Sequence, residues 1–360
     1  MKNFTARKLS RKFLLNVTSC SYSRMFHSKQ PFLTPHIFRF VATWFCNCNC
    51  LICGIPNLKK PQKEIPLPDL KTMLHNSRPA LADVRRISVA GGEPFLRKDL
   101  VEALLLLAKH CPKVSEIGIA TNGSLPEKTF ADLKRLVAAI PSTKIVLTVS
   151  LDGIGSLHDE IRGYRSLFER ALLTIEKVKV LRTHHQNLDL TCQITYNTAN
   201  IPVRKQIEDF VTEMGIPFCY DFAHLADSLY WNGDKAEHLL QPEAVRDIFH
   251  RRNFIDYYIL KQHICQRRYL PCPAPFNLFS LAPDGGIANC IMCKEAGNLY
   301  HDSLMNILRL EKIEKTFAQI KESDLCRACY FRCGLKWELY GNLPQLLRMG
   351  ITQILLMLRN

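Results

Sequence analysis

The chain has 360 residues, with 48 Lys and Arg against 33 Asp and Glu, a formal net charge of +15 and 15 cysteines. So many cysteines would indicate a disulfide scaffold in a secreted protein, but no apolar signal-peptide core opens the chain and two cysteine groups have metal-ligand spacing. We therefore expect a reducing compartment, the cytoplasm. The length suits one barrel-sized domain plus a small extension.

The N-terminal arm, residues 1–35, is strongly basic. Residues 1–39 contain eight Lys or Arg and no Asp or Glu, which is more than half of the net charge. Three interpretations compete: a solvated arm, a transit peptide, or an arm that binds phosphates or an anionic membrane surface. The sequence has no basic stripe interleaved with aromatic residues, so we expect no nucleic-acid partner.

From residue 36 onward, short apolar runs alternate with helix-like stretches. The runs end near Phe45, Ala90, Ala120, Ser150, Thr195 and Phe222, and the predicted helices are Pro68–His75, Asp99–His110, Pro126–Ala139, Ser166–Leu181, Val203–Met214 and Pro242–Arg251. Such alternation predicts a parallel sheet with right-handed crossovers. We predict an α/β fold over residues 36–255, a partial (β/α)6 TIM-like barrel that is open on one side.

Three cysteines follow the first predicted strand, Phe38–Phe45, in a CxxxCxxC run: Cys46, Cys50 and Cys53. A loop this short brings three thiolates to one side. Because Fe–S clusters normally take four cysteine ligands, a cubane held by three has one iron open to another ligand. A zinc knuckle or a chance cluster is the alternative for this loop alone. We expect Cys48, inside the run, to be a bystander.

Polar residues also follow the later strands. The second strand leads into Gly91-Gly92-Glu93, where the glycines let a ligand approach the backbone and the glutamate offers an acceptor to a cationic amine. Ser150-Leu151-Asp152 ends the fourth strand, and Arg162 follows an acidic pair. Because β/α barrels build their active sites at the carboxyl ends of strands, we predict one site there.

With these motifs, residues 36–225 resemble the radical S-adenosylmethionine (SAM) enzymes. The resemblance implies that Cys46, Cys50 and Cys53 hold a [4Fe–4S] cluster that binds SAM. It also implies SAM contacts for Ile52 near the adenine, Gly91, Gly92 and Glu93 at the amino group, Ser150 and Asp152 at the ribose, and Arg162 at the methionyl carboxylate. The fifth strand, Leu188–Thr195, is expected to add a contact through Gln193, Thr195 or Asn197.

A second cysteine group lies downstream. Cys272 precedes a predicted hairpin of two strands, Phe276–Ala282 and Ile287–Asn289, and a helical stretch, Leu304–Lys321, leads to a CxxC pair. This pattern resembles the SPASM and twitch extensions of radical SAM enzymes. The resemblance implies one auxiliary [4Fe–4S] cluster on Cys272, Cys290, Cys326 and Cys329, with Cys333 and Cys293 as alternative ligands. A closed zinc site is the other reading of this cysteine-rich α+β domain, residues 256–335.

The resemblance implies a function as well. We expect an enzyme that cleaves SAM reductively to a 5′-deoxyadenosyl radical, abstracts hydrogen from a substrate and uses the auxiliary cluster in an oxidation, with flavodoxin or ferredoxin as electron donor. A peptide- or protein-modifying maturase and a non-catalytic Fe–S or zinc module are the alternatives. The 35 residues before the first strand are too few and too basic for a peptide-recognition domain, which favours a small, phosphorylated or lipid-linked substrate.

The C-terminal tail, residues 336–360, is apolar and helix-like, with Lys336, Arg348 and Arg359 against one acid, Glu338. Together with the basic arm it would suit peripheral contact with the inner face of an anionic membrane. Its longest apolar run, Ile354–Leu358, is far shorter than the roughly 20 residues of a transmembrane helix.

Overall fold

The computed structural model describes residues 31–58, 63–223, 237–238, 274–290 and 295–320. The basic arm up to residue 30, the predicted helix Pro242–Arg251 and the tail lie outside these ranges. So do five of the downstream cysteines, namely Cys272, Cys293, Cys326, Cys329 and Cys333. The predicted domain bounds at residues 255 and 335 therefore stay predictions.

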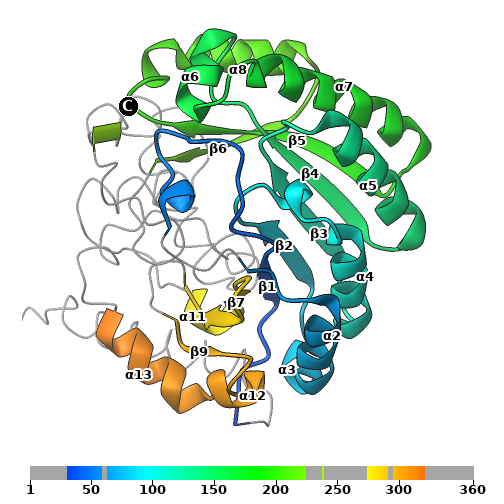
Figure 1. Ribbon diagram of the computed structural model, residues 1–360, viewed down its shortest axis with the longest axis vertical. Coiled ribbons are helices and arrows are strands. Elements are labelled where there is room, and N and C mark those ends of the chain that lie inside the picture. Colours follow the sequence, from blue (N-terminus) through cyan, green and yellow to red (C-terminus); the bar gives the residue numbers. More distant parts are fainter. Residues whose placement is uncertain (1–30, 59–62, 224–236, 239–273, 291–294, 321–360) are drawn as a thin grey trace, which may run out of the picture.

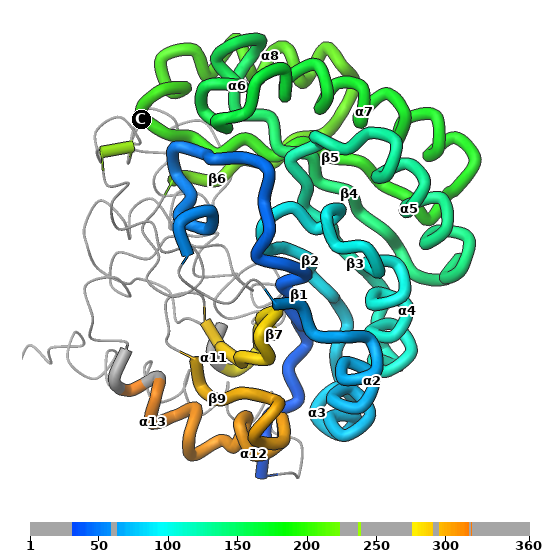
Figure 2. The backbone as a smooth tube through the Cα atoms, in the orientation of Figure 1, coloured from blue at the N-terminus to red at the C-terminus, as the bar shows by residue number. Residues whose placement is uncertain are grey.

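A nine-stranded sheet crosses the described residues in the order β6-β5-β4-β3-β2-β1-β7-β8-β9 (Figures 1 and 2). The first six strands are β1 (Ile37–Val41), β2 (Arg86–Ala90), β3 (Glu116–Thr121), β4 (Lys144–Ser150), β5 (Leu188–Tyr196) and β6 (Phe218–Phe222). Each runs parallel to its neighbours, and the sheet does not close. The structure confirms the predicted α/β fold with a partial, TIM-like barrel.

Buried side chains alternate along β2 to β5 because successive residues point to opposite faces of a sheet. In β2, for example, Ile87 and Val89 are buried while their neighbours are half-buried. The buried face packs against α4 (Leu100–His110), α5 (Pro126–Ala139) and α7 (Leu167–His184), which lie outside the sheet in Figure 1. Each fully buried Ile, Leu or Val contributes roughly 1.5–3 kcal/mol, so this layer holds the sheet and leaves the opposite face for polar residues.

Five predicted helices are present: α5 has the predicted bounds, and the ends of α2 (Leu67–Asn76), α4, α7 and α8 (Arg204–Glu213) differ from them by up to three residues. A proline near the first position begins α2 and α5, because proline has no N–H to satisfy there. The sequence did not predict α6 (Ser156–Arg162), which ends at Gly163 in the left-handed conformation usual after helices. Short turns complete the set: α3 (Arg78–Leu81), η1 (Ile55–Asn57), η2 (Pro94–Leu96) and η3 (Ile201–Val203).

The predicted hairpin is present and extends the barrel sheet. β7 (Leu278–Leu281) is antiparallel to β8 (Gly286–Ala288), which pairs with β9 (Gly297–Asn298). β7 also runs parallel to β1, and the rings of Phe38 and Phe279 stack with centroids 4.4 Å apart. The hairpin of the cysteine-rich extension therefore continues the core sheet.

The predicted helix Leu304–Lys321 is two helices, α12 (Leu304–Ile307) and α13 (Leu310–Ile320), preceded by α11 (Ala274–Asn277). The break lies where the chain pairs with residues 31–33: the Leu33 N–H donates to the carbonyl of Leu308 (3.0 Å) and the Leu310 N–H to that of Pro31 (3.2 Å). Among the described residues, no helix has both the length and the apolar character to cross a membrane.

Candidate functional site

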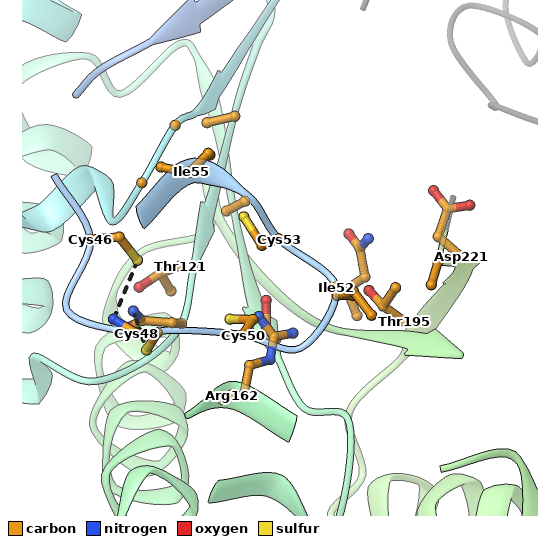
Figure 3. Close-up of a pocket in the computed structure, with 18 of the residues that line it drawn as sticks. Cys46, Cys48, Cys50, Ile52, Cys53, Ile55, Thr121, Arg162, Thr195 and Asp221 are labelled. Atoms are coloured by element: carbon orange, nitrogen blue, oxygen red, sulfur yellow. Dashed lines mark hydrogen bonds between the residues drawn. The ribbon is translucent and has the colours of Figure 1, made fainter. Parts of the chain in front are cut away.

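The carboxyl ends of the parallel strands surround a cavity of about 360 Å³ (Figure 3). That volume lies in the range of roughly 300–1,000 Å³ typical of small-molecule sites. The polar and sulfur-bearing residues of its wall are Cys46, Cys48, Cys50, Cys53, Thr121, Asn122, Ser150, Arg162, Gln193, Thr195 and Asp221, together with Ile52 and the backbone of Gly91 and Gly92. Residues that are far apart in the sequence thus meet in one place.

The cysteine loop leaves the sheet earlier than predicted, since β1 ends at Val41. The end of helix α6 is hydrogen-bonded to the loop: the Asn49 N–H donates to the carbonyl of Arg162 (3.1 Å) and the Leu51 N–H to that of Ile161 (2.9 Å). Gly163 packs directly against the loop and leaves no room for a side chain, because a Cβ atom there would lie 2.3 Å from the Asn49 carbonyl oxygen. The end of α6 therefore sets the position of the loop.

The Gly91-Gly92-Glu93 segment holds the other side of the same loop. The Gly92 N–H donates to the carbonyl of Thr43 and the Glu93 N–H to that of Phe45, both at 2.8 Å. A Cβ atom on Gly92 would lie 1.9 Å from the Phe45 oxygen, and Gly91 has a φ of +135° that other residues rarely adopt. The two glycines thus let two backbone segments run in contact, and both line the cavity.

Cys48 lies close to the other thiols of the loop, and its assignment as a bystander stays a prediction. The Cys48 N–H donates to the Cys46 Sγ at 3.5 Å, and hydrogen bonding among the three thiols raises the pKa of Cys48 and lowers that of Cys46. The bond from Cys48 also lowers the pKa of Cys50 to about 7, with burial opposing it and Arg162 assisting it. Cys53 differs, because burial raises its pKa to about 12.

Asn122, which follows β3, connects this loop to the sheet. Its Nδ2 donates to the Asn47 Oδ1 (2.9 Å) and to the Cys48 Sγ (3.0 Å), and the Asn47 Nδ2 donates to the Ser124 Oγ (2.8 Å). Asn122 was not among the predicted site residues. Its two partners lie 74 and 75 residues away, so no local pattern indicates them.

Glu93 lies behind the cavity, and its contact with the SAM amine stays a prediction. Its side chain is 1% exposed and is absent from the cavity wall. One carboxylate oxygen accepts from the Phe95 N–H (3.1 Å) and the Thr121 hydroxyl (2.8 Å), and the other from the Asn122 N–H (2.7 Å). Burial raises the pKa of Glu93 to about 7, against these three bonds. Glu93 thereby joins η2 to the end of β3.

Ser150 and Arg162 line the cavity, as predicted from their positions, but Asp152 does not. Its fully buried carboxylate lies 2.6 Å from the Arg162 Nη2 and accepts from the Thr195 N–H at 2.7 Å. Burial lowers the pKa of Arg162, but Asp152 together with Cys50 and Cys48 outweighs this effect and the net shift is upward, so the guanidinium stays charged.

The structure also separates the candidates on β5. Gln193 and Thr195 line the cavity, whereas Asn197 is fully buried and its side chain bonds to the backbone of Thr195 and Ala199. Asp221, at the end of β6 opposite Thr195, also lines the cavity and was missed by the sequence reasoning. Figure 3 shows it on the far side of Ile52 from the cysteines.

The described residues contain no group of three Cys, His, Asp or Glu side chains arranged around a single metal ion. A cubane cluster binds each thiolate through a different iron, so its cysteines surround a larger object than one ion. Three of the four predicted downstream ligands, Cys272, Cys326 and Cys329, lie outside the described residues. Of these four, Cys290, which follows β8 and is half-buried, is the described one.

Several proteins of known name are similar to this chain. The molybdenum cofactor biosynthesis protein moc-5 of Caenorhabditis elegans is 28% identical over 172 residues, covering 43% of this chain and 27% of that protein. The GTP 3′,8-cyclase of Pasteurella multocida is 27% identical over 173 residues, covering 45% and 49%. The PqqA peptide cyclase of Bradyrhizobium diazoefficiens is 24% identical over 310 residues, covering 80% and 76%. The chain spans less than half of the length of the first two.

Solved structures share the fold. Histidine-tagged anSMEcpe with bound AdoMet has a TM-score of 0.56 at 16% identity, covering 82% of this chain and 85% of that one. Native anSMEcpe with bound AdoMet and the Cp18Cys peptide has a TM-score of 0.55 at 15% identity, covering 82% and 87%. At these identities the likeness concerns the fold alone.

Two family models match. The radical SAM superfamily model covers residues 41–196, which include the core cysteines and every predicted SAM contact except the candidate Asn197. The SPASM iron–sulfur cluster-binding domain covers residues 272–330, which include all four predicted auxiliary ligands. The first domain implies a [4Fe–4S] cluster and SAM as cofactors, and the second implies auxiliary Fe–S clusters. The chain therefore belongs to the radical SAM superfamily and carries a SPASM domain.

Proposed function

We propose that this chain is a radical SAM enzyme that binds SAM at a [4Fe–4S] cluster, cleaves it reductively and abstracts hydrogen from a substrate. One observation carries the proposal. The cysteine loop, the Gly91-Gly92 pair, Ser150 and Arg162 come from four stretches of sequence and line one cavity at the carboxyl ends of parallel strands. Barrel enzymes place their active sites at this end.

The cavity fits these cofactors chemically. Cys46, Cys50 and Cys53 offer three thiols from one short loop, which suits a cubane with an open iron. The Arg162 Nε is buried and has no hydrogen-bond partner among the described residues, so it can donate to a carboxylate. We propose that the three cysteines hold the cluster and that Ile52, Gly91, Gly92, Ser150 and Arg162 contact SAM.

The protein's own part is to orient the bound groups and to limit water. When bound, the reduced cluster and SAM supply a 5′-deoxyadenosyl radical that removes a hydrogen atom from the substrate. Part of the cavity wall is apolar and restricts water near the reacting atoms. Its residues include Ile52, Ile55, Ala90, Ala120 and Phe222. Glu93 lies behind the cavity wall with three protein donors, and since a carboxylate has about four acceptor positions, its Oε2 could accept one further donor.

For the extension we propose one auxiliary [4Fe–4S] cluster on Cys272, Cys290, Cys326 and Cys329, which accepts an electron from the substrate in a net oxidation. Support comes from the SPASM match, which includes all four positions. The electron for the core cluster would come from an external donor such as flavodoxin or ferredoxin.

Two substrate classes remain in the proposal. The basic charge of residues 1–39 favours a small, phosphorylated or lipid-linked substrate. A peptide substrate is the second candidate, because a relative whose match covers 80% of the chain is named a PqqA peptide cyclase.

The test is SAM cleavage by anaerobically reconstituted, dithionite-reduced protein. We expect 5′-deoxyadenosine and methionine without added substrate, and none from the triple variant in which Cys46, Cys50 and Cys53 are changed to Ala. The variant should still bind the iron and sulfide of the downstream cluster, whereas zinc without sulfide would support the closed zinc site. Cleavage by the triple variant would refute the assignment of the core cluster, and a wild-type protein that never cleaves SAM would favour a non-catalytic module.

A further inference from the structure

The Asp152 carboxylate lies behind the cavity wall, not in it. Its exposed fraction is 0%, it does not line the cavity, and it forms an ion pair of 2.6 Å with the Arg162 Nη2, whose side chain is 12% exposed. The two residues come from different elements, the end of β4 and the last residue of α6. Asp152 thus contacts the Arg162 guanidinium from behind the cavity wall, on the side opposite the space that a ligand would occupy.

Three further contacts fix this carboxylate and its backbone. The Thr195 N–H donates to the Asp152 Oδ1 at 2.7 Å, and the Asn200 Nδ2 donates to the Asp152 carbonyl at 2.9 Å. The Asp152 N–H donates to the His158 Nδ1 at 3.1 Å. Asp152 therefore has a single position, determined by β4, β5 and α6 together, and its direction toward Arg162 is built into the fold.

Arg162 stands between this carboxylate and the cysteine loop. Its guanidinium lies beside Cys50 in Figure 3 and hydrogen-bonds to that thiol, while its carbonyl accepts from the Asn49 N–H. Since Nη2 faces Asp152 and Nε has no partner among the described residues, the guanidinium has donors left for an anion in the cavity. The orientation of those donors depends on the ion pair.

We propose that Asp152 is a positioning residue that orients Arg162 toward the carboxylate end of SAM, and that it makes no contact with the ribose. This inference rests on the proposed function, because it assigns a recognition step to the same cavity. A buried guanidinium that loses its paired carboxylate loses both its counter-charge and its fixed direction. Discrimination in favour of a carboxylate-bearing ligand should then be lost together with Asp152.

The experiment compares two ligands on anaerobically reconstituted protein: SAM and its decarboxylated analogue, whose binding is measured by equilibrium dialysis. For Asp152→Asn we expect the SAM dissociation constant to rise about tenfold or more, the scale of one charge-assisted contact. The analogue should bind within about twofold of its wild-type value, and iron content should be unchanged. Equal losses for both ligands would overturn the proposal in favour of a ribose contact or a purely structural role.

Asp189→Asn is the matched control, since Asp189 is an aspartate of β5 that pairs with Lys144 at 2.6 Å and lies outside the cavity wall. It should change neither dissociation constant. If Asp152→Asn does not fold, Asp152→Glu replaces it; the longer side chain keeps the charge but misplaces Arg162, so SAM alone should bind more weakly. Equal weakening for the two ligands would again overturn the proposal.

A double-variant cycle with Arg162→Lys separates the roles further. If Asp152 acts through Arg162, adding Asp152→Asn to Arg162→Lys should change the SAM dissociation constant by less than about twofold. Additive losses would refute this route. A wild-type protein that binds neither ligand would instead refute the proposed function, so the two failures can be told apart.

Discussion

Changing Gly163 to Ala should displace the cysteine loop, and Gly215 offers a matched control. Both glycines follow a helix with φ near +60°, at 60° and 68°, so alanine costs roughly 1–2 kcal/mol of backbone strain at either position. At Gly215 a Cβ atom would meet nothing within 4 Å. At Gly163 it would lie 2.3 Å from the Asn49 oxygen, which belongs to the loop between Cys46 and Cys50.

The magnitude follows from that contact. Real Cβ contacts essentially never fall under 3.0 Å, so the loop or α6 must shift by about 0.7 Å, the difference between 3.0 and 2.3 Å. The shift strains the hydrogen bonds from Asn49 and Leu51 to α6, each worth about 1 kcal/mol. We expect Gly163→Ala to cost roughly 3–4 kcal/mol of unfolding free energy, and Gly215→Ala only the roughly 1–2 kcal/mol of strain.

Urea unfolding of the two variants measures this difference, and iron analysis with SAM cleavage measures its effect on the site. Misplacement by somewhat under 1 Å should lower cleavage on the order of tenfold to a hundredfold in Gly163→Ala and leave Gly215→Ala near wild type. Equal stabilities together with equal iron contents would refute the reasoning that α6 positions the loop.

Four other outcomes are expected. Glu93→Gln should lower the unfolding free energy by about 1–3 kcal/mol in urea unfolding, because either orientation of the amide leaves one backbone N–H without an acceptor; an unchanged midpoint would contradict this. In cluster-free protein, carboxyl ¹³C NMR should show Glu93 titrating near pH 7. Because this folded-state pKa lies above the ordinary 4.5, the folded state should lose stability as the pH rises from 4.5 to 7. Titration below pH 5 would show that burial does not raise the pKa of Glu93. Cys48→Ala should keep the core cluster, whereas Cys50→Ala should lose it, as judged by iron and sulfide analysis; iron loss in Cys48→Ala would make that thiol a ligand. Adding Cys290→Ala to the core triple variant should remove the remaining iron, and retained iron would exclude Cys290 from the auxiliary site.

Much of the fold could be predicted from the sequence because its signals are local. Short apolar runs identify β2 to β6 within a few residues, and a proline begins α2 and α5. The spacing of Cys46, Cys50 and Cys53 needs only one loop to bring the thiols together, so the sequence alone indicates a cluster site. The same holds for the Gly91-Gly92 pair, whose place at a strand end determines its position in the cavity.

Which polar side chains face the cavity, and which residues they contact, was decided only by the tertiary structure. Ser150 and Asp152 are two residues apart at the end of β4, yet one lines the cavity and the other is buried against Arg162. Likewise, Gln193 on β5 lines the cavity, whereas Asn197, just after β5, is fully buried. These outcomes depend on which elements meet at one point, and the elements that meet there are tens of residues apart in sequence. Sequence periodicity therefore determined the strands and the cysteine loop, and packing across the crossovers decided which polar side chains face the cavity.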